Sequence, residues 1–172
     1  MRFRTGALQL DKQTCGGLPA GLVEFSGADA CGKTALALSV VREAGLAGLP
    51  CAFIHMQGGA PDVNFLRSAG ISSMLVTTPP YGEAAVEAAF ATLRAGCKVV
   101  VVDSFTNLRP RCEDTMLVGD RAPAARLAYH AATVLREEAL QQDSLVLLTS
   151  ELRANLGHYG EISAYERVLA AC

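Results

Sequence analysis

The chain has 172 residues, of which 51% are hydrophobic and 19% are charged. This length fits one domain with a sizeable core, and the high apolar content excludes a disordered protein. The formal net charge of -2 excludes a basic surface over the whole chain, so any nucleic-acid contact requires a local cationic cluster or several subunits acting together.

The sequence gives no signal for membrane insertion or secretion. No apolar run approaches the roughly 20 residues of a membrane helix, and the N-terminal stretch MRFRTGALQL has no apolar signal-peptide core. We therefore expect a cytoplasmic protein with no membrane partner. The six cysteines show no C-x-x-C spacing, so we expect reduced thiols that are buried or incidental.

The first informative stretch is GADACGKT, which follows a predicted strand at residues 22–26 and precedes a predicted helix at residues 33–44. It fits the phosphate-loop pattern G-x-x-x-x-G-K-[ST], with the strand before and the helix after that the motif requires. Its glycines let backbone N–H groups point inward as an anion cradle. Lys33 would reach the β- and γ-phosphates, and the Thr34 hydroxyl would ligate Mg²⁺.

This motif predicts nucleotide contacts along the loop and the first helical residues. The expected residues are Gly27, Ala28, Asp29, Ala30, Cys31, Gly32, Lys33, Thr34 and Ala35. Because Cys31 lies inside the loop, its oxidation would obstruct nucleotide binding.

The remaining elements alternate between apolar strands and Ala/Leu-rich helices. Strands are predicted at residues 51–56, 74–78, 99–104 and 145–150, and helices at 63–69, 83–95 and 122–142. This alternation predicts an α/β fold with a mostly parallel sheet covered by helices on both faces. The less regular segments 106–121 and 152–172 leave from strand carboxyl ends, where open α/β sheets place their ligands.

A carboxylate closes the most apolar strand, in the stretch VVVVDS. In P-loop proteins an acid at the end of a buried strand holds Mg²⁺, usually through a water. Asp103 is the candidate for this role.

The chain resembles the core of the RecA family of recombinases. The matching segments stand in the same order and with similar spacing from about Thr5 to Arg153; they are TGALQLDKQTCGGLPAGLVEFSG, GADACGKTALAL, CAFI, GEAAVEAAFATLRAG, VVVVDS, AARLAYHAATVLREEA and LVLLTSELR. The resemblance implies a RecA-like P-loop core, ATP and Mg²⁺ bound between neighbouring subunits, and single-stranded DNA held by the two irregular segments. Another RecA-like subunit or a repair protein is the expected partner.

The resemblance also places further binding residues. Asp62 and Phe65 fall near the acid and the aromatic ring that contact adenine in the family, although Phe65 equally fits a core position. The candidate DNA-facing residues are Arg109, Arg111, Arg121, Arg126, Arg153 and His158. Neighbouring acids at positions 113, 114 and 120 offset much of their field, and His158 with the tyrosine after it also fits an ordinary surface.

Two departures from the family fall at catalytic positions. Gln57 stands where the resemblance implies an acid that orients the attacking water. A glutamine positions water but accepts a proton poorly, so we expect slow hydrolysis unless Asp62 or another carboxylate compensates. Glu151 stands where the family has a glutamine that senses the γ-phosphate. A glutamate there is unfavourable near phosphate unless a cation screens it, and it equally fits a strand-end carboxylate turned to solvent.

Both ends are short compared with the family. We expect a single core domain over residues 1–172, without the N-terminal polymerisation arm and the C-terminal domain. The strand at 22–26 should lie beside the strand at 145–150, and the family's later strands cover its other side. Here a short strand near residues 167–171, a partner or a second copy would have to pair with that edge.

The first functional hypothesis is a RecA-like ATP-binding protein of recombination or DNA repair with slow, DNA-linked ATPase activity. The alternative is a non-catalytic RecA-fold regulator that docks on a recombinase or polymerase. Intact Lys33, Thr34 and Asp103 favour the first, and the residues at positions 57 and 151 favour the second. An unrelated P-loop kinase lacks support, because no second substrate site is visible.

Overall fold

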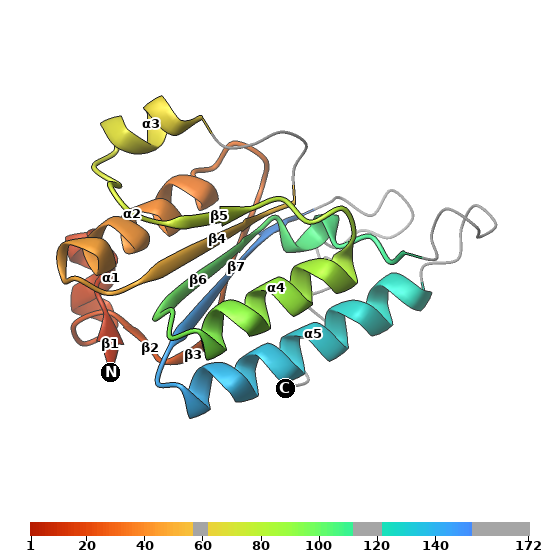
Figure 1. Cartoon of the computed structure of the whole chain (residues 1–172). Coiled ribbons are helices and arrows are strands. Elements are labelled where there is room, and N and C mark those ends of the chain that lie inside the picture. The colour runs from red at the N-terminus through yellow and green to blue at the C-terminus, as the bar shows by residue number, and fades with distance from the viewer. Residues whose placement is uncertain (57–61, 112–121, 153–172) are drawn as a thin grey trace.

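The computed structural model describes residues 1–56, 62–111 and 122–152, and its centre is a parallel sheet. The five strands of this sheet run in the order β3-β7-β6-β4-β5, and every neighbouring pair is parallel (Figure 1). The strands are β3 (Gly21–Gly27), β4 (Cys51–His55), β5 (Leu75–Thr77), β6 (Val99–Asp103) and β7 (Leu145–Glu151). The predicted α/β fold with a parallel sheet is confirmed.

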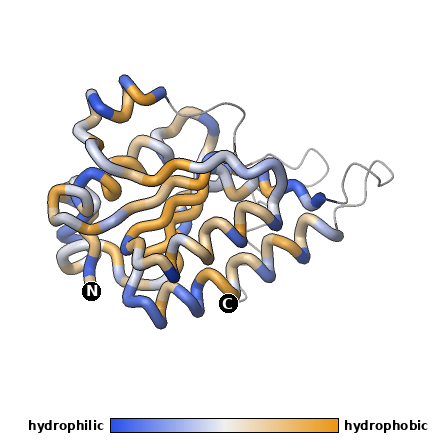
Figure 2. The backbone as a smooth tube through the Cα atoms, in the orientation of Figure 1, coloured by the Kyte–Doolittle hydropathy of each residue, from blue (hydrophilic) through white to orange (hydrophobic). Residues whose placement is uncertain are grey.

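The central strands are apolar because both faces of the sheet are covered. In β6, Val100 and Val102 join one hydrophobic cluster, whereas Val99 and Val101 join the cluster on the opposite face. All four side chains are at most 2% exposed. A strand buried on both faces reads as a continuous apolar run instead of an alternating one, and Figure 2 shows the central strands as the most hydrophobic part of the backbone.

Helices form the two outer layers (Figure 1). Helix α2 (Lys33–Leu46) connects the edge strand β3 to β4, and it therefore crosses the face of β6 and β7 that lies between them. Helices α4 (Gly82–Arg94) and α5 (Ala122–Gln141) cover the opposite face. Helix α5 also packs on β3: a Cβ atom on Gly21 would lie 3.3 Å from the Leu140 Cδ2 atom.

Two short elements lie at the carboxyl ends of the strands. Helix α3 (Val63–Ser68) follows β4, and the 3₁₀ turn η1 (Phe105–Asn107) follows β6. Both are shorter than two full helical turns. The predicted helices and strands all occur, with ends that differ by one or two residues from the expected bounds.

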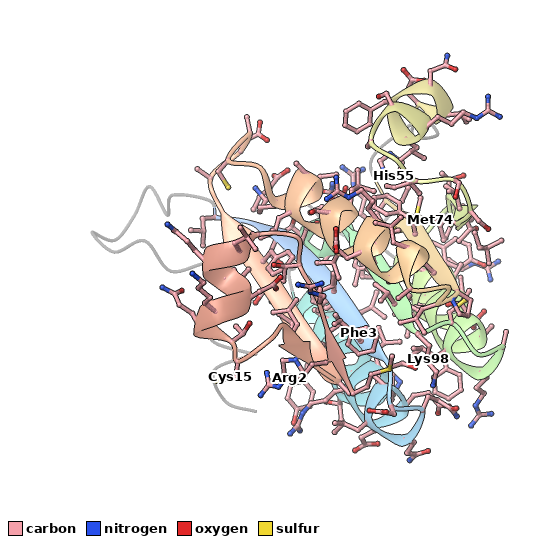
Figure 3. The ribbon with its side chains drawn as sticks, turned by 90° about the vertical axis from the view of Figure 1, so that its left-hand side faces the viewer. Arg2, Phe3, Cys15, His55, Met74 and Lys98 are labelled. Carbon is pink, nitrogen blue, oxygen red and sulfur yellow. The ribbon has the colours of Figure 1, made fainter. Side chains whose placement is uncertain are left out.

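The N-terminal segment is structured, although the sequence analysis assigned no element before residue 22. Strand β1 (Arg2–Phe3) pairs antiparallel with β2 (Leu18–Pro19), and helix α1 (Leu8–Gln13) lies between them. Phe3 and Leu18 join the cluster under α2. Arg2, labelled in Figure 3, donates from Nη1 to the carbonyls of Thr14 and Gly17, and these hydrogen bonds join β1 to the turn between α1 and β2. These elements are too short to show a hydrophobic period.

The predicted neighbour of the loop-bearing strand is confirmed. Strand β3 pairs along its whole length with β7, from Gly21 opposite Leu145 to Gly27 opposite Glu151. In the part of the chain that the structure describes, β3 has no second neighbour in the sheet. The expected tail strand at residues 167–171 lies outside the described residues. No helix in the described ranges is long and apolar enough to cross a bilayer.

A buried carboxylate organises the turn that leads into α1. Asp11 accepts two hydrogen bonds at Oδ1, from the Thr5 backbone N–H at 2.8 Å and from the Thr5 hydroxyl at 2.7 Å. Burial acts to raise the pKa of Asp11, but the hydrogen bonds from Thr5 stabilise the ionised form and leave the pKa below its ordinary value. The charged form therefore contributes to the stability of the fold.

We predict that Asp11→Ala lowers the free energy of unfolding by about 1 to 2 kcal/mol near neutral pH, because two hydrogen bonds to a charged acceptor are lost. The folded-state pKa of Asp11 is depressed, so this contribution is full above the unfolded-state pKa of about 4 and is lost as the pH falls through the folded-state value. Urea denaturation at several pH values measures the difference, which should shrink below about pH 4.

Glu87→Ala is the matched control, since Glu87 is an exposed carboxylate on α4. Its effect should stay within about 0.5 kcal/mol. A difference between parent and Asp11→Ala that grows on acidification would contradict the prediction.

Candidate functional site

The glycine-rich loop joins the carboxyl end of β3 to the start of α2, as the motif requires. A Cβ atom on Gly27 would lie 2.7 Å from the Cys31 Sγ atom, so no side chain fits there without movement. Gly32 has a φ of 95°, in the left-handed region that favours glycine, and it precedes the first residue of α2. The backbone path of the loop therefore favours glycine at position 32, whereas at position 27 an added Cβ atom would displace the Cys31 side chain.

The lysine of the motif is folded onto the loop. Its Nζ atom donates to the carbonyl oxygen of Gly27 at 3.1 Å and to that of Ala28 at 2.7 Å. Both acceptors are neutral. A phosphate would compete well for this ammonium, because hydrogen bonds between charged partners are stronger than those to neutral carbonyls.

The aspartate that ends β6 connects two neighbouring elements. Thr34, in the first turn of α2, donates its hydroxyl to Asp103 Oδ2 at 3.0 Å. Thr149, on β7, donates its hydroxyl to Asp103 Oδ1 at 2.5 Å. Asp103 is 2% exposed and Thr149 is fully buried. The structure thus brings the predicted pair Thr34 and Asp103 together and adds a threonine that the sequence analysis did not identify.

These groups open into one cleft of about 310 Å³ at the carboxyl ends of the strands. Its lining residues are Asp29, Ala30, Gly32, Lys33, Thr34, Ala35, Leu38, Phe65, Asp103 and Glu151. Among these described lining residues, three are carboxylates and one is an ammonium, so an anion entering the cleft meets net negative charge. A divalent cation that accompanies the anion would remove this penalty.

The two residues expected near adenine have different environments. Phe65 lies on α3, lines the cleft and is 53% exposed, so its ring is open to a ligand and the alternative of a core position does not hold. Asp62 is the N-cap of α3 and accepts a hydrogen bond from the Asn64 backbone N–H at 2.8 Å. Asp62 is not among the cleft-lining residues. Its carboxylate has a structural use as a helix cap.

The two expected catalytic departures are only partly visible. Gln57 lies outside the described residues. Glu151 ends β7 opposite Gly27 in the sheet register and lines the cleft beside Asp103. The backbone N–H of the next residue, Leu152, donates to the Gly27 carbonyl at 3.0 Å, so the hydrogen bonds between β7 and β3 continue as far as the loop. A carboxylate therefore faces the cleft at the position where the family resemblance places a glutamine.

Three of the DNA-facing candidates lie in the described structure: Arg109 and Arg111 after η1, and Arg126 in the amino-terminal part of α5. Arg109 and Arg111 follow η1 and lie by the amino end of α4, where the Arg109 carbonyl accepts the Gly82 N–H at 2.7 Å. The Arg111 N–H donates to the Glu83 carboxylate at 3.0 and 3.2 Å, and its guanidinium lies 5.5 Å from the Tyr81 ring centroid. Arg111 is therefore engaged with α4. Arg121, Arg153 and His158 lie outside the described residues.

One further side chain near Asp103 was not assigned a function from the sequence. His55, labelled in Figure 3, is the last residue of β4. It lies opposite Asp103 in the register of β4 and β6, and its ring stacks on Phe53 with 5.9 Å between the centroids. Its Nδ1 atom is buried, and no described residue hydrogen-bonds to it. No sequence pattern distinguishes a strand-end histidine near a functional site from one that only packs in the core.

The glycine-rich loop between a first parallel strand and the following helix, with an aspartate at the end of a nearby strand, defines a P-loop protein of the α/β class. The model of the RecA N-terminal domain matches residues 2–163. The chain belongs to the RecA family.

Individual relatives agree with this assignment. Over 160 residues the chain is 36% identical to Protein RecA of Rhizobium rhizogenes and 38% identical to Protein RecA of Blastochloris viridis. Each alignment covers 89% of this chain, but 44% and 46% of the respective relatives. The chain therefore spans less than half the length of these relatives.

We predict that Mg²⁺·ATP protects Cys31 from alkylation by iodoacetamide, because Cys31 is exposed within the loop that would enclose the phosphates. Exposed Cys15 is the internal control and should react at the same rate with and without nucleotide. Burial raises the pKa of the Cys51 thiol to about 11, so this residue should stay unlabelled near neutral pH. Peptide mass spectrometry measures each site, and equal labelling of Cys31 in both conditions would contradict nucleotide binding at the loop.

Proposed function

We propose that this chain is the nucleotide-binding core of a RecA-family protein of homologous recombination or DNA repair, which binds Mg²⁺·ATP and hydrolyses it slowly in a reaction linked to DNA. The observation that carries the proposal is the joint placement of Lys33, Thr34 and Asp103 in one cleft. Each has the functional group that its position in a P-loop site requires.

The described residues fit a magnesium ion. Thr34 and Asp103 present hydroxyl and carboxylate oxygens, which Mg²⁺ accepts as ligands directly or through water. Their hydrogen bond of 3.0 Å already holds the two oxygens side by side in the cleft. Bound with the nucleotide, Mg²⁺ would supply positive charge that neutralises the phosphate oxygens. The excess of carboxylates in the cleft supports nucleotide binding that depends on this ion.

The chain's own residues would bind and orient the nucleotide around that ion. The Lys33 ammonium would exchange its carbonyl acceptors for phosphate oxygens, and the N–H groups at the start of α2 would donate to the same phosphates. Phe65 would stack on the base, since its ring is open to the cleft. Asp62 contributes by holding the amino end of α3, which carries Phe65.

Slow hydrolysis follows from the residue types at two positions. Gln57 would position the attacking water without taking its proton readily. The carboxylate of Glu151 would face the phosphates and would require Mg²⁺ or Lys33 to screen it. These two residues also favour the second candidate, a RecA-fold regulator that uses nucleotide as a structural ligand and docks on a recombinase or polymerase.

The exposed face of α5 supports contact with single-stranded DNA. Arg126, Tyr129 and His130 are exposed, and the two aromatic residues lie three and four positions after Arg126, so they share its face of the helix. Arginine binds phosphate, and an aromatic ring offers a stacking surface to a base. This face lies near the amino end of α5, toward the end of the sheet that holds the carboxyl ends of the strands (Figure 1). Arg109, also exposed, would add positive charge at this edge.

Contact with another RecA-like subunit or a repair protein completes the proposal. The family resemblance implies ATP bound between neighbouring subunits, and the 53% exposure of Phe65 at the cleft supports a surface that a second chain would contact.

We predict that Gln57→Glu raises the single-turnover rate of ATP hydrolysis by about tenfold or more, because general-base catalysis contributes about 10²-fold or more when correctly placed. Rapid-quench measurements with and without single-stranded DNA test this. Lys33→Ala is the control for the site and should abolish binding and turnover together. ATP binding without turnover in both the parent and Gln57→Glu would support the regulator instead of the ATPase.

We also predict that Arg126→Ala reduces the salt dependence of single-stranded DNA binding by about one unit of slope, because one phosphate contact is lost. Arg136→Ala is the matched control, since Arg136 is an exposed arginine of the same helix almost three turns farther from its amino end. Fluorescence anisotropy at several salt concentrations measures both. A slope for Arg126→Ala equal to those of the parent and of Arg136→Ala would contradict a phosphate contact at this face of α5.

A further inference from the structure

We propose that Thr149 is a positioning residue for the magnesium site: its hydroxyl holds the Asp103 carboxylate in the orientation that Thr34 and the ion require. The inference rests on the proposed binding of Mg²⁺·ATP. It assigns a task to a strand residue that lies outside the phosphate loop and does not line the cleft.

The geometry fixes the carboxylate from two sides. Thr149 donates to Oδ1 of Asp103 at 2.5 Å, and Thr34 donates to Oδ2 at 3.0 Å. Because each carboxylate oxygen has its own hydroxyl donor, rotation about the Cβ–Cγ bond would break both hydrogen bonds. Asp103 is 2% exposed, so water has little access to replace either donor.

Packing alone does not account for a threonine at this position. Leu145 and Leu147 precede it on the same face of β7, and both are fully buried in the cluster under α2. A valine would continue this apolar series with the same shape as threonine. A buried hydroxyl is unfavourable unless it is hydrogen-bonded, and the partner of the Thr149 hydroxyl is the carboxylate at the cleft.

A hydrogen-bond donor to a metal-binding carboxylate affects the affinity for the metal more than the affinity for the nucleotide itself. Removing such an outer partner typically reduces metal affinity by about 10- to 100-fold. Lys33 and the loop, which would bind the phosphates, make their contacts without Thr149. The loss should therefore appear in the Mg²⁺ concentration required for nucleotide binding, and it should disappear when Mg²⁺ is saturating.

The test is a Mg²⁺ titration of the whole chain at a fixed concentration of fluorescent ATP analogue. The Mg²⁺ midpoint is the Mg²⁺ concentration at which half of the maximal analogue binding is reached. For Thr149→Val, which keeps the shape and removes the hydroxyl, we expect this midpoint to rise about tenfold or more. At saturating Mg²⁺ the analogue should bind the variant and the parent with affinities that agree within about threefold. Thr149→Ser restores the hydroxyl and should return the midpoint to within about threefold of the parent.

Thr92→Val is the matched control for loss of a buried hydroxyl. Thr92 is 7% exposed and donates to the Ala89 carbonyl within α4, on the other face of the sheet. Its Mg²⁺ midpoint should equal that of the parent. If Thr149→Val does not fold, Thr149→Ala removes the same hydroxyl without placing a methyl group against the carboxylate.

The outcomes separate the inference from the function on which it rests. An unchanged midpoint in Thr149→Val, an equal rise in Thr92→Val, or a loss of affinity that persists at saturating Mg²⁺ would overturn the positioning role while the parent still binds. A failure of Thr149→Ser to restore the midpoint would overturn it as well. If the parent itself shows no Mg²⁺-dependent binding of the analogue, the proposed function fails, and the inference fails with it.

Discussion

Parallel pairing of all five central strands is the constraint on which the rest of this structure depends. Two parallel neighbours cannot be joined by a tight turn, so each connection must cross a face of the sheet, and here four of the helices lie in such connections. Both faces become buried, which explains the apolar runs in β6 and β7. The same constraint brings the carboxyl ends of all five strands to one end of the sheet, where the glycine-rich loop, Asp103 and Glu151 line the cleft.

The sheet and the core of the site were predictable because their signals are local. The stretch GADACGKT matches a loop with a left-handed conformation at Gly32, and VVVVDS places an acid at the end of a doubly buried strand. The N-terminal elements escaped prediction, since two-residue strands and a six-residue helix show no period. Hydrogen bonds and side-chain contacts stabilise them instead, such as those between Thr5 and Asp11.

The partners of site residues were not predictable in the same way. Thr149 sits among leucines of β7 and reads as one more strand residue, and its contact with Asp103 spans 46 positions of the sequence. Arg111 is the opposite case, because the sequence shows a cation in a loop while the structure places its guanidinium over the Tyr81 ring and ties its backbone N–H to Glu83. Charge and residue type identify candidates, but only the folded neighbours show whether a side chain is already occupied.

The packing of Leu140 against Gly21 fixes where the rest of α5 lies relative to the edge strand. The helix has 20 residues and is therefore about 30 Å long. One region of it rests on the edge strand that carries the glycine-rich loop, and its opposite end presents Arg126 and Tyr129 to solvent. Arg126 lies 14 positions before Leu140, so about 21 Å of helix separates this exposed face from the contact with the edge strand. One helix thus fixes the position of this face relative to the strand that carries the glycine-rich loop.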